Sequence, residues 1–153
     1  MKEAYQNEMA QRVWQRVRGE EENGIAAHTL QEMIAGEWSD AAAYLALSRK
    51  TTGKESSILR RLFEEEQSHM ACLKGIYTLI TGAKPNLPRT PVPQEPMEVT
   101  LRKCYSREMH TLAAYEQRSA DREYGPVFAR LAQQEREHCR MVLELIGGLQ
   151  KGR

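Results

Sequence analysis

The residues of this chain that are best suited to chemistry form a pattern that occurs twice. Each copy contains a Glu-x-x-His pair, preceded in an earlier segment by a Glu that stands seven positions before a Tyr. The two copies are Glu37, Tyr44, Glu66 and His69, and then Glu108, Tyr115, Glu135 and His138. Four carboxylates and two imidazoles at these spacings match a four-helix bundle that binds two metal ions in its core.

Each of these glutamates interrupts an apolar helical stripe, as Glu66 does between Leu62 and Leu73. An unpaired carboxylate in an apolar core is costly or stays protonated, so four of them require a compensating positive charge. Two divalent cations provide that charge, and a Glu and a His three positions apart on a helix point the same way. One such pair is usually a solvated coincidence, but its repetition on apolar stripes favours a metal site. The predicted metal ligands are Glu37, Glu66, His69, Glu108, Glu135 and His138.

Several neighbouring residues are candidates for supporting roles. Tyr44 and Tyr115 lie two helical turns after their glutamates, where they can hydrogen-bond ligand carboxylates and quench oxidising equivalents; the alternative is a core Tyr with a satisfied hydroxyl. Asp40 is expected to be solvated or to support the ligands, with an extra ligand or a proton donor as the alternative. Outward-facing charge is expected of Glu64, Glu65 and Glu137.

The elements that position these residues are expected to be helices, because strand and hairpin signals are almost absent and strong helix formers are abundant. We predict helices at about 29–50, 55–81, 99–122 and 125–147, with a loop near 119–123. A capping box of Thr29 and Glu32 is predicted to open the first helix. Glu37 and Glu66 lie at similar distances on either side of the turn at Thr52, so antiparallel helices bring them to the same height.

A long connection is predicted at residues 82–98, which contain all the prolines except Pro126. At a polyproline rise of about 3.1 Å per residue it covers roughly 50 Å, whereas the preceding helix is roughly 40 Å long at about 1.5 Å per residue. The connection can therefore traverse the bundle. The predicted fold class is all-α, a ferritin-like four-helix bundle with one long crossover between its second and third helices, plus an N-terminal accessory helix.

The size and charge of the chain narrow its class. We expect an accessory helix in residues 1–24 and a single bundle domain in residues 25–153. The 22 Lys and Arg nearly balance the 21 Asp and Glu, which does not favour nucleic acid or a membrane as partner. No disulfide framework, signal segment or membrane-length apolar run is evident, so a cytoplasmic protein is expected. The apolar stripe of residues 2–20 predicts a homo-oligomer, a dimer or larger, unless it packs on its own bundle.

Three stretches resemble the rubrerythrin-like branch of the ferritin-like superfamily, over about residues 27–149. They are Leu-Gln-Glu-Met-Ile-Ala-Gly-Glu37, Phe-Glu-Glu-Glu66-Gln-Ser-His69 and Leu-Ala-Gln-Gln-Glu135-Arg-Glu-His138. The resemblance implies that the six predicted ligands hold two iron ions, with Glu66 and Glu135 bridging them. It also implies that the reduced pair delivers two electrons to hydrogen peroxide or dioxygen.

Two departures from that family bear on function. The chain has no cysteines arranged as in a rubredoxin domain, so an external electron donor is expected. Thr111 stands where rubrerythrins carry another Glu. We therefore expect a di-iron oxidoreductase that acts on hydrogen peroxide or dioxygen; manganese is also compatible with the ligands, and zinc can occupy such a site adventitiously. The alternatives are manganese-catalase-like disproportionation, an iron-binding or ferroxidase storage-type subunit, and a metal-poor structural module.

Overall fold

The computed structural model of the chain describes residues 3–4, 6–11 and 25–151, and within these ranges every regular element is an α-helix. Four long helices make up the bundle: α2 (Ala27–Ser48), α3 (Gly53–Thr81), α4 (Met97–Arg118) and α5 (Gly125–Lys151). The prediction of an all-α fold is confirmed. Residues 3–4 and 6–11 are helical as well, and the rest of the predicted accessory helix lies outside the described residues. Among the described helices, none combines the length and apolar character needed to cross a membrane.

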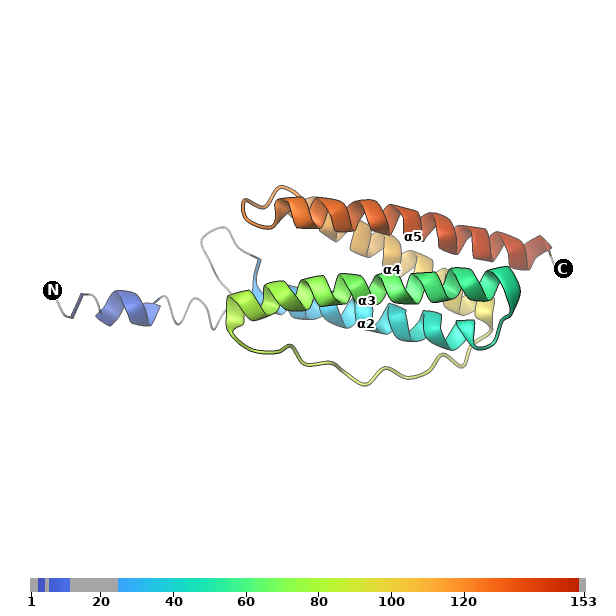
Figure 1. Ribbon diagram of the computed structural model, residues 1–153, viewed down its shortest axis with the longest axis horizontal. Coiled ribbons are helices and arrows are strands. Elements are labelled where there is room, and N and C mark those ends of the chain that lie inside the picture. Colours follow the sequence, from blue (N-terminus) through green and yellow to red (C-terminus); the bar gives the residue numbers. More distant parts are fainter. Residues whose placement is uncertain (1–2, 5, 12–24, 152–153) are drawn as a thin grey trace.

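The four helices form two antiparallel hairpins that pack side by side (Figure 1). Helix α2 pairs with α3 and α4 pairs with α5, while α2 also contacts α4 and α3 contacts α5. Helices α3 and α4 run in the same direction, so the segment between them must return along the whole bundle. Residues 82–96 do so without regular structure, which gives the predicted long crossover, ending where α4 begins at Met97.

The crossover is attached to the outer face of α2. The indole Nε1–H of Trp38 donates a hydrogen bond to the Pro88 carbonyl at 2.9 Å. Gln31 both donates to the Asn86 carbonyl and accepts from the Asn86 N–H. Gly82 ends α3 in a left-handed conformation, with φ of 72°, which a residue without Cβ adopts at little cost. These contacts direct the extended chain along the bundle.

The start of α2 differs from the sequence prediction. The helix begins at Ala27, after Ala26, and no side chain caps it. Glu32 instead pairs with His28 one turn earlier, at 3.0 Å. The predicted capping box of Thr29 and Glu32 is therefore wrong, because Thr29 lies inside the first turn of the helix and not at its N-cap position.

The end of α5 also differs. Gly147 and Gly148 were expected to end the helix, yet it continues to Lys151. A glycine inside a helix costs about 1 kcal/mol relative to alanine. Burial of Ile146 and packing of Leu149 against the core offset this cost. By contrast α4 ends at Arg118, so its loop begins at Ser119 as expected.

The apolar core is divided into two clusters. One is built around Leu30, Leu73 and Phe128, and the other around Leu47, Leu62 and Val142. On every helix the predicted metal ligands fall between a residue of one cluster and a residue of the other. The polar layer therefore lies midway along the bundle, with dry packing on both sides.

Candidate metal centre

The six predicted ligands meet in the layer between the two core clusters. All of them are buried, and none is more than 2% exposed. Helices α2 and α4 each contribute one glutamate, and α3 and α5 each contribute a Glu-x-x-His pair. One ligand atom from each member of the two pairs lies within 4.8 Å of the others. The structure thus brings together residues from all four helices.

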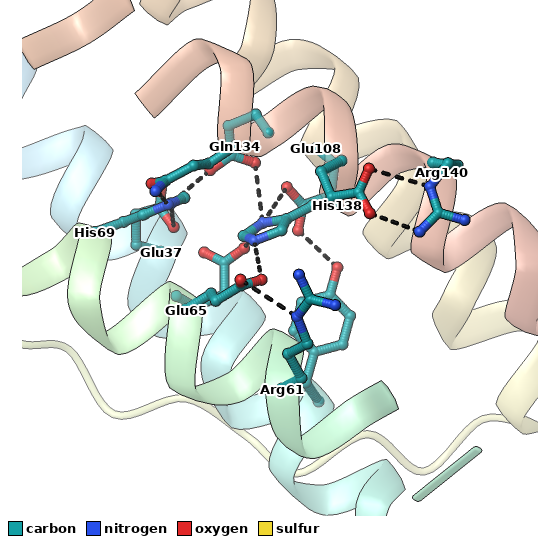
Figure 2. A network of polar contacts seen from close by, with 12 residues as sticks. Glu37, Arg61, Glu65, His69, Glu108, Gln134, His138 and Arg140 are labelled. Carbon is teal, nitrogen blue, oxygen red and sulfur yellow. Dashed lines mark hydrogen bonds and ion pairs between the residues drawn. The ribbon is translucent and has the colours of Figure 1, made fainter. Parts of the chain in front are cut away.

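The carboxylates of the predicted ligands gather around two imidazoles, those of His69 and His138 (Figure 2). Nδ1 of His69 lies 2.8 Å from a Glu135 oxygen and 3.7 Å from a Glu37 oxygen. The two rings stack, with centroids 5.1 Å apart. Nδ1 of the second imidazole, that of His138, lies 2.9 to 3.6 Å from carboxylate oxygens of Glu66, Glu108 and Glu135. Because Glu135 approaches both rings, it is placed to be shared by two cations.

Several buried atoms of this layer have no hydrogen-bond partner within the described part of the chain. They are Oε2 of Glu37, both carboxylate oxygens of Glu66, Oε2 of Glu108, Oε2 of Glu135 and Nδ1 of His138. Leaving such an atom unsatisfied costs about 1–3 kcal/mol, and more when it is charged. Nδ1 of His138 and a Glu66 oxygen are 2.9 Å apart without hydrogen-bonding geometry. Groups that converge in this way without bonding one another fit a shared cation, which satisfies all of them at once.

Each of the two predicted tyrosines hydrogen-bonds to a glutamate of the other hairpin. The Tyr44 hydroxyl on α2 donates to Oε1 of Glu108 at 2.6 Å, and the Tyr115 hydroxyl on α4 donates to Oε1 of Glu37. Burial and the adjacent carboxylate charges raise the pKa of both phenols well above the ordinary value. Both hydroxyls therefore remain protonated donors, and each fixes one oxygen of its glutamate while the other oxygen faces the layer.

The sequence interpretation missed the residues that orient the imidazoles. Nε2 of His69 lies 2.7 Å from Oε1 of Gln134, and Nε2 of His138 lies 3.1 Å from Oε2 of Glu65 (Figure 2). In the neutral rings a proton on each Nε2 satisfies both contacts and makes Nδ1 the nitrogen that can bind a cation. Glu65 was expected to face outward into solvent. Its side chain is instead partly buried, because its carboxylate contacts His138. The sequence contained one signal for these residues. Glu65 and Gln134 occupy equivalent positions in the repeat, each four residues before a predicted ligand histidine.

Asp40 was expected either to be solvated or to support the ligands, and its position excludes the solvated alternative. Its side chain is almost fully buried, and Nε of Arg107 donates to its Oδ1. Burial and the charge of Glu108 raise the pKa of Asp40 to about 7, although Arg107 opposes this shift. Asp40 joins Glu66 and Glu108 in a second group of oxygens that all lie within 4.8 Å of one another. This carboxylate therefore belongs to the polar layer.

Without a bound cation, protons must balance the carboxylate charge. Burial and the charge of Glu37 raise the pKa of Glu135 well above its ordinary value. Burial alone would lower the pKa of His138, but the nearby carboxylates of Glu108 and Glu135 raise it to about 11. Divalent cations balance the same charge without protons, so cation binding and proton loss are linked.

The donor set narrows the class of metal. Carboxylate oxygens with one imidazole for each position suit iron, manganese and zinc, and the site contains no thiolate that would favour a softer ion. A search of protein-family models, curated proteins and solved structures gave no match to this chain. The function of the chain must therefore be inferred from the site.

Proposed function

We propose that this chain is a rubrerythrin-like di-iron protein of the ferritin-like type, which reduces hydrogen peroxide or dioxygen with electrons from an external donor. The observation that carries the proposal is the buried layer in which four carboxylates and two imidazoles converge from four helices with unpartnered oxygens. The two hairpins and the long crossover support the ferritin-like topology.

The residues of the layer have distinct roles in this proposal. His69 and His138 would each hold one cation through Nδ1, and Glu37 and Glu108 would complete the two positions. Glu66 and Glu135 would be shared between the two cations. When bound, two ferrous ions would supply two electrons, enough with two protons to reduce hydrogen peroxide to two waters or dioxygen to hydrogen peroxide. Tyr44 and Tyr115 hold the terminal carboxylates in place by their hydrogen bonds. The dry clusters on both sides exclude water and keep the charge interactions strong.

The metal stoichiometry gives the first test. Metal-free protein is reconstituted anaerobically with Fe(II), and the metal that stays bound after desalting is measured. We expect two ions per chain, and clearly fewer in Glu66→Ala and Glu135→Ala. Glu137→Ala is the matched control, because Glu137 is a partly exposed glutamate on the same helix as Glu135 and is not one of the predicted ligands. Wild-type protein that retains far fewer than two ions, or mutants that match it, would refute the di-metal centre.

The reaction with oxidants gives the second test. The reduced protein is mixed with hydrogen peroxide or with dioxygen in a stopped-flow instrument, and oxidation is followed by absorbance. A faster reaction with peroxide supports the reductase. A faster reaction with dioxygen in a large assembly points to ferroxidase storage instead, and sustained dioxygen release from peroxide by manganese-loaded protein points to catalase chemistry.

A further inference from the structure

A second group of carboxylates lies against the proposed di-metal centre. It consists of Asp40, Glu66 and Glu108, which are all buried. Both oxygens of Glu66 and Oε2 of Glu108 lack a hydrogen-bond partner, and Asp40 is paired with Arg107. Three carboxylates exceed the two positive charges that face them, the Arg107 guanidinium and the His138 imidazolium, so an excess of negative charge remains in a buried place. The unpartnered oxygens of Glu66 point to a cation as the missing partner.

A pocket between α2 and α4 reaches this group from outside. Its volume is about 520 Å³, and its wall includes Asp40 and Arg107 but none of the six predicted ligands. Asp40 is therefore the residue that both borders the pocket and lies within 4.8 Å of ligand oxygens. A cation that arrives through the pocket meets Asp40 before it meets the centre.

The internal repeat explains why the pocket is open beside this ion pair. Since Glu37 corresponds to Glu108, Asp40 corresponds to Thr111 and Arg107 corresponds to Gly36. Thr111 and Gly36 line the same pocket. One side of it therefore holds a charged pair, and the equivalent positions on the other side hold short, uncharged residues.

We propose that Asp40, together with Glu66 and Glu108, forms an uptake site for a divalent cation on its way to the centre; this inference rests on the proposed function. A site built from carboxylate oxygens suits hard divalent ions such as Mn²⁺ and Fe²⁺. The arriving cation displaces Arg107 from Asp40. The Arg107 side chain is 40% exposed, so its guanidinium can turn into solvent without remaining buried and unpaired.

Transfer from the uptake site to the centre requires only an exchange of one ligand. Glu66 and Glu108 also lie 2.9 and 3.6 Å from Nδ1 of His138. A cation held by these two glutamates can therefore leave Asp40 and gain the imidazole without losing its other contacts. After transfer Arg107 returns to Asp40, and the uptake site is ready for a second ion.

The rate of metal uptake tests this inference. Metal-free, full-length protein is mixed with Co²⁺, and the visible absorption of the bound ion is followed by stopped flow. We expect Asp40→Asn to load about tenfold more slowly, because it removes the charge that attracts the cation. Its final stoichiometry and spectrum should equal those of the wild type. Thr111→Val, a change in the same pocket, is the control and should load at the wild-type rate, whereas Arg107→Gln should load at least as fast.

Several outcomes overturn the uptake site. If Asp40→Asn takes up Co²⁺ at the wild-type rate, Asp40 is not on the uptake route. If Asp40→Asn binds one ion fewer than the wild type, Asp40 is a permanent ligand of the centre instead. If Asp40→Asn fails to fold, Arg107→Gln decides, because slower loading in that variant contradicts displacement of the guanidinium. Wild-type protein that binds no Co²⁺ refutes the di-metal centre as well, so the two failures are distinguishable.

Discussion

Replacing Glu65 by Gln tests whether the two metal positions are inequivalent. In the wild-type protein the Nε2–H of His138 faces a carboxylate, whereas the Nε2–H of His69 faces the amide of Gln134. A carboxylate partner makes the opposite ring nitrogen a stronger donor than an amide partner does. The position that uses His138 should therefore bind a cation more tightly than the position that uses His69.

The size of the effect follows from the contact. Loss of such an orienting partner typically costs about 10- to 100-fold in metal affinity. Glu65 is 35% exposed and also pairs with Arg61 at 3.4 Å, so solvent and the guanidinium screen its charge. We therefore expect the lower end of the range, a loss of about tenfold, or about 1.4 kcal/mol, at one position only.

The assay is a Co²⁺ titration of metal-free protein against a competing chelator, fitted to two stepwise constants. The wild type should show two unequal dissociation constants for Co²⁺. Glu65→Gln should make the two constants more nearly equal, because it weakens binding at the tighter position. The reciprocal change, Gln134→Glu, should strengthen the weaker one. Glu64→Gln is the matched control, because it removes the same charge from an exposed neighbour. If Glu65→Gln leaves both constants within about twofold of the wild type, the carboxylate does not tune the imidazole, and the reasoning fails.

Three further predictions concern the same layer. Tyr115→Phe removes the donor to Glu37 and should lower the free energy of unfolding of the metal-free protein by about 1.5–3 kcal/mol in urea; the half-buried Tyr105→Phe is the control, and equal losses would contradict the role of the hydrogen bond. Cation binding at pH 7 should release protons, because Glu135 has a raised pKa and that of His138 is about 11, so apparent affinity rises with pH. Calorimetry in two buffers of unequal ionisation enthalpy measures this release, and an enthalpy that does not depend on the buffer would count against it. A divalent cation at about 1,000 times its dissociation constant should stabilise the fold by about 4 kcal/mol, reversibly with EDTA, and an unchanged melting temperature would exclude binding at the centre.

The sequence was informative about the bundle because the helical spacing of apolar residues also shows which side chains a helix buries. Glu66 and His69 fall on an apolar stripe, so any helix that buries the stripe must also bury them. The long crossover was predictable from its prolines, which exclude a helix and allow the chain to span the bundle. The start of α2 and the end of α5 were not predictable from local signals, since α2 begins two residues before Thr29 and tertiary packing carries α5 past Gly147 and Gly148.

The supporting residues could not be predicted in the same way. A Glu in an acidic run such as that around Glu65 is solvated in most helices, and only the packing of α3 against α5 places its carboxylate on His138. The Tyr contacts are similar, since each hydroxyl reaches the glutamate of the other hairpin rather than its own. Contacts between hairpins depend on the inter-helix distance and rotation, which a periodic pattern does not contain.

The repeat gives the two halves of the layer the same ligands but different surroundings. Glu65 contacts His138, and Asp40 lies near Glu66 and Glu108, which are also neighbours of His138. The corresponding positions on the other side hold the uncharged Gln134 and Thr111. The arginines that pair with Glu65 and Asp40 are partly exposed and can turn into solvent, so the two carboxylates would favour a cation at His138. A chain that only needed to hold two equivalent ions would gain nothing from this bias, whereas a chain that takes up ions in order, through one side of the bundle, would require it.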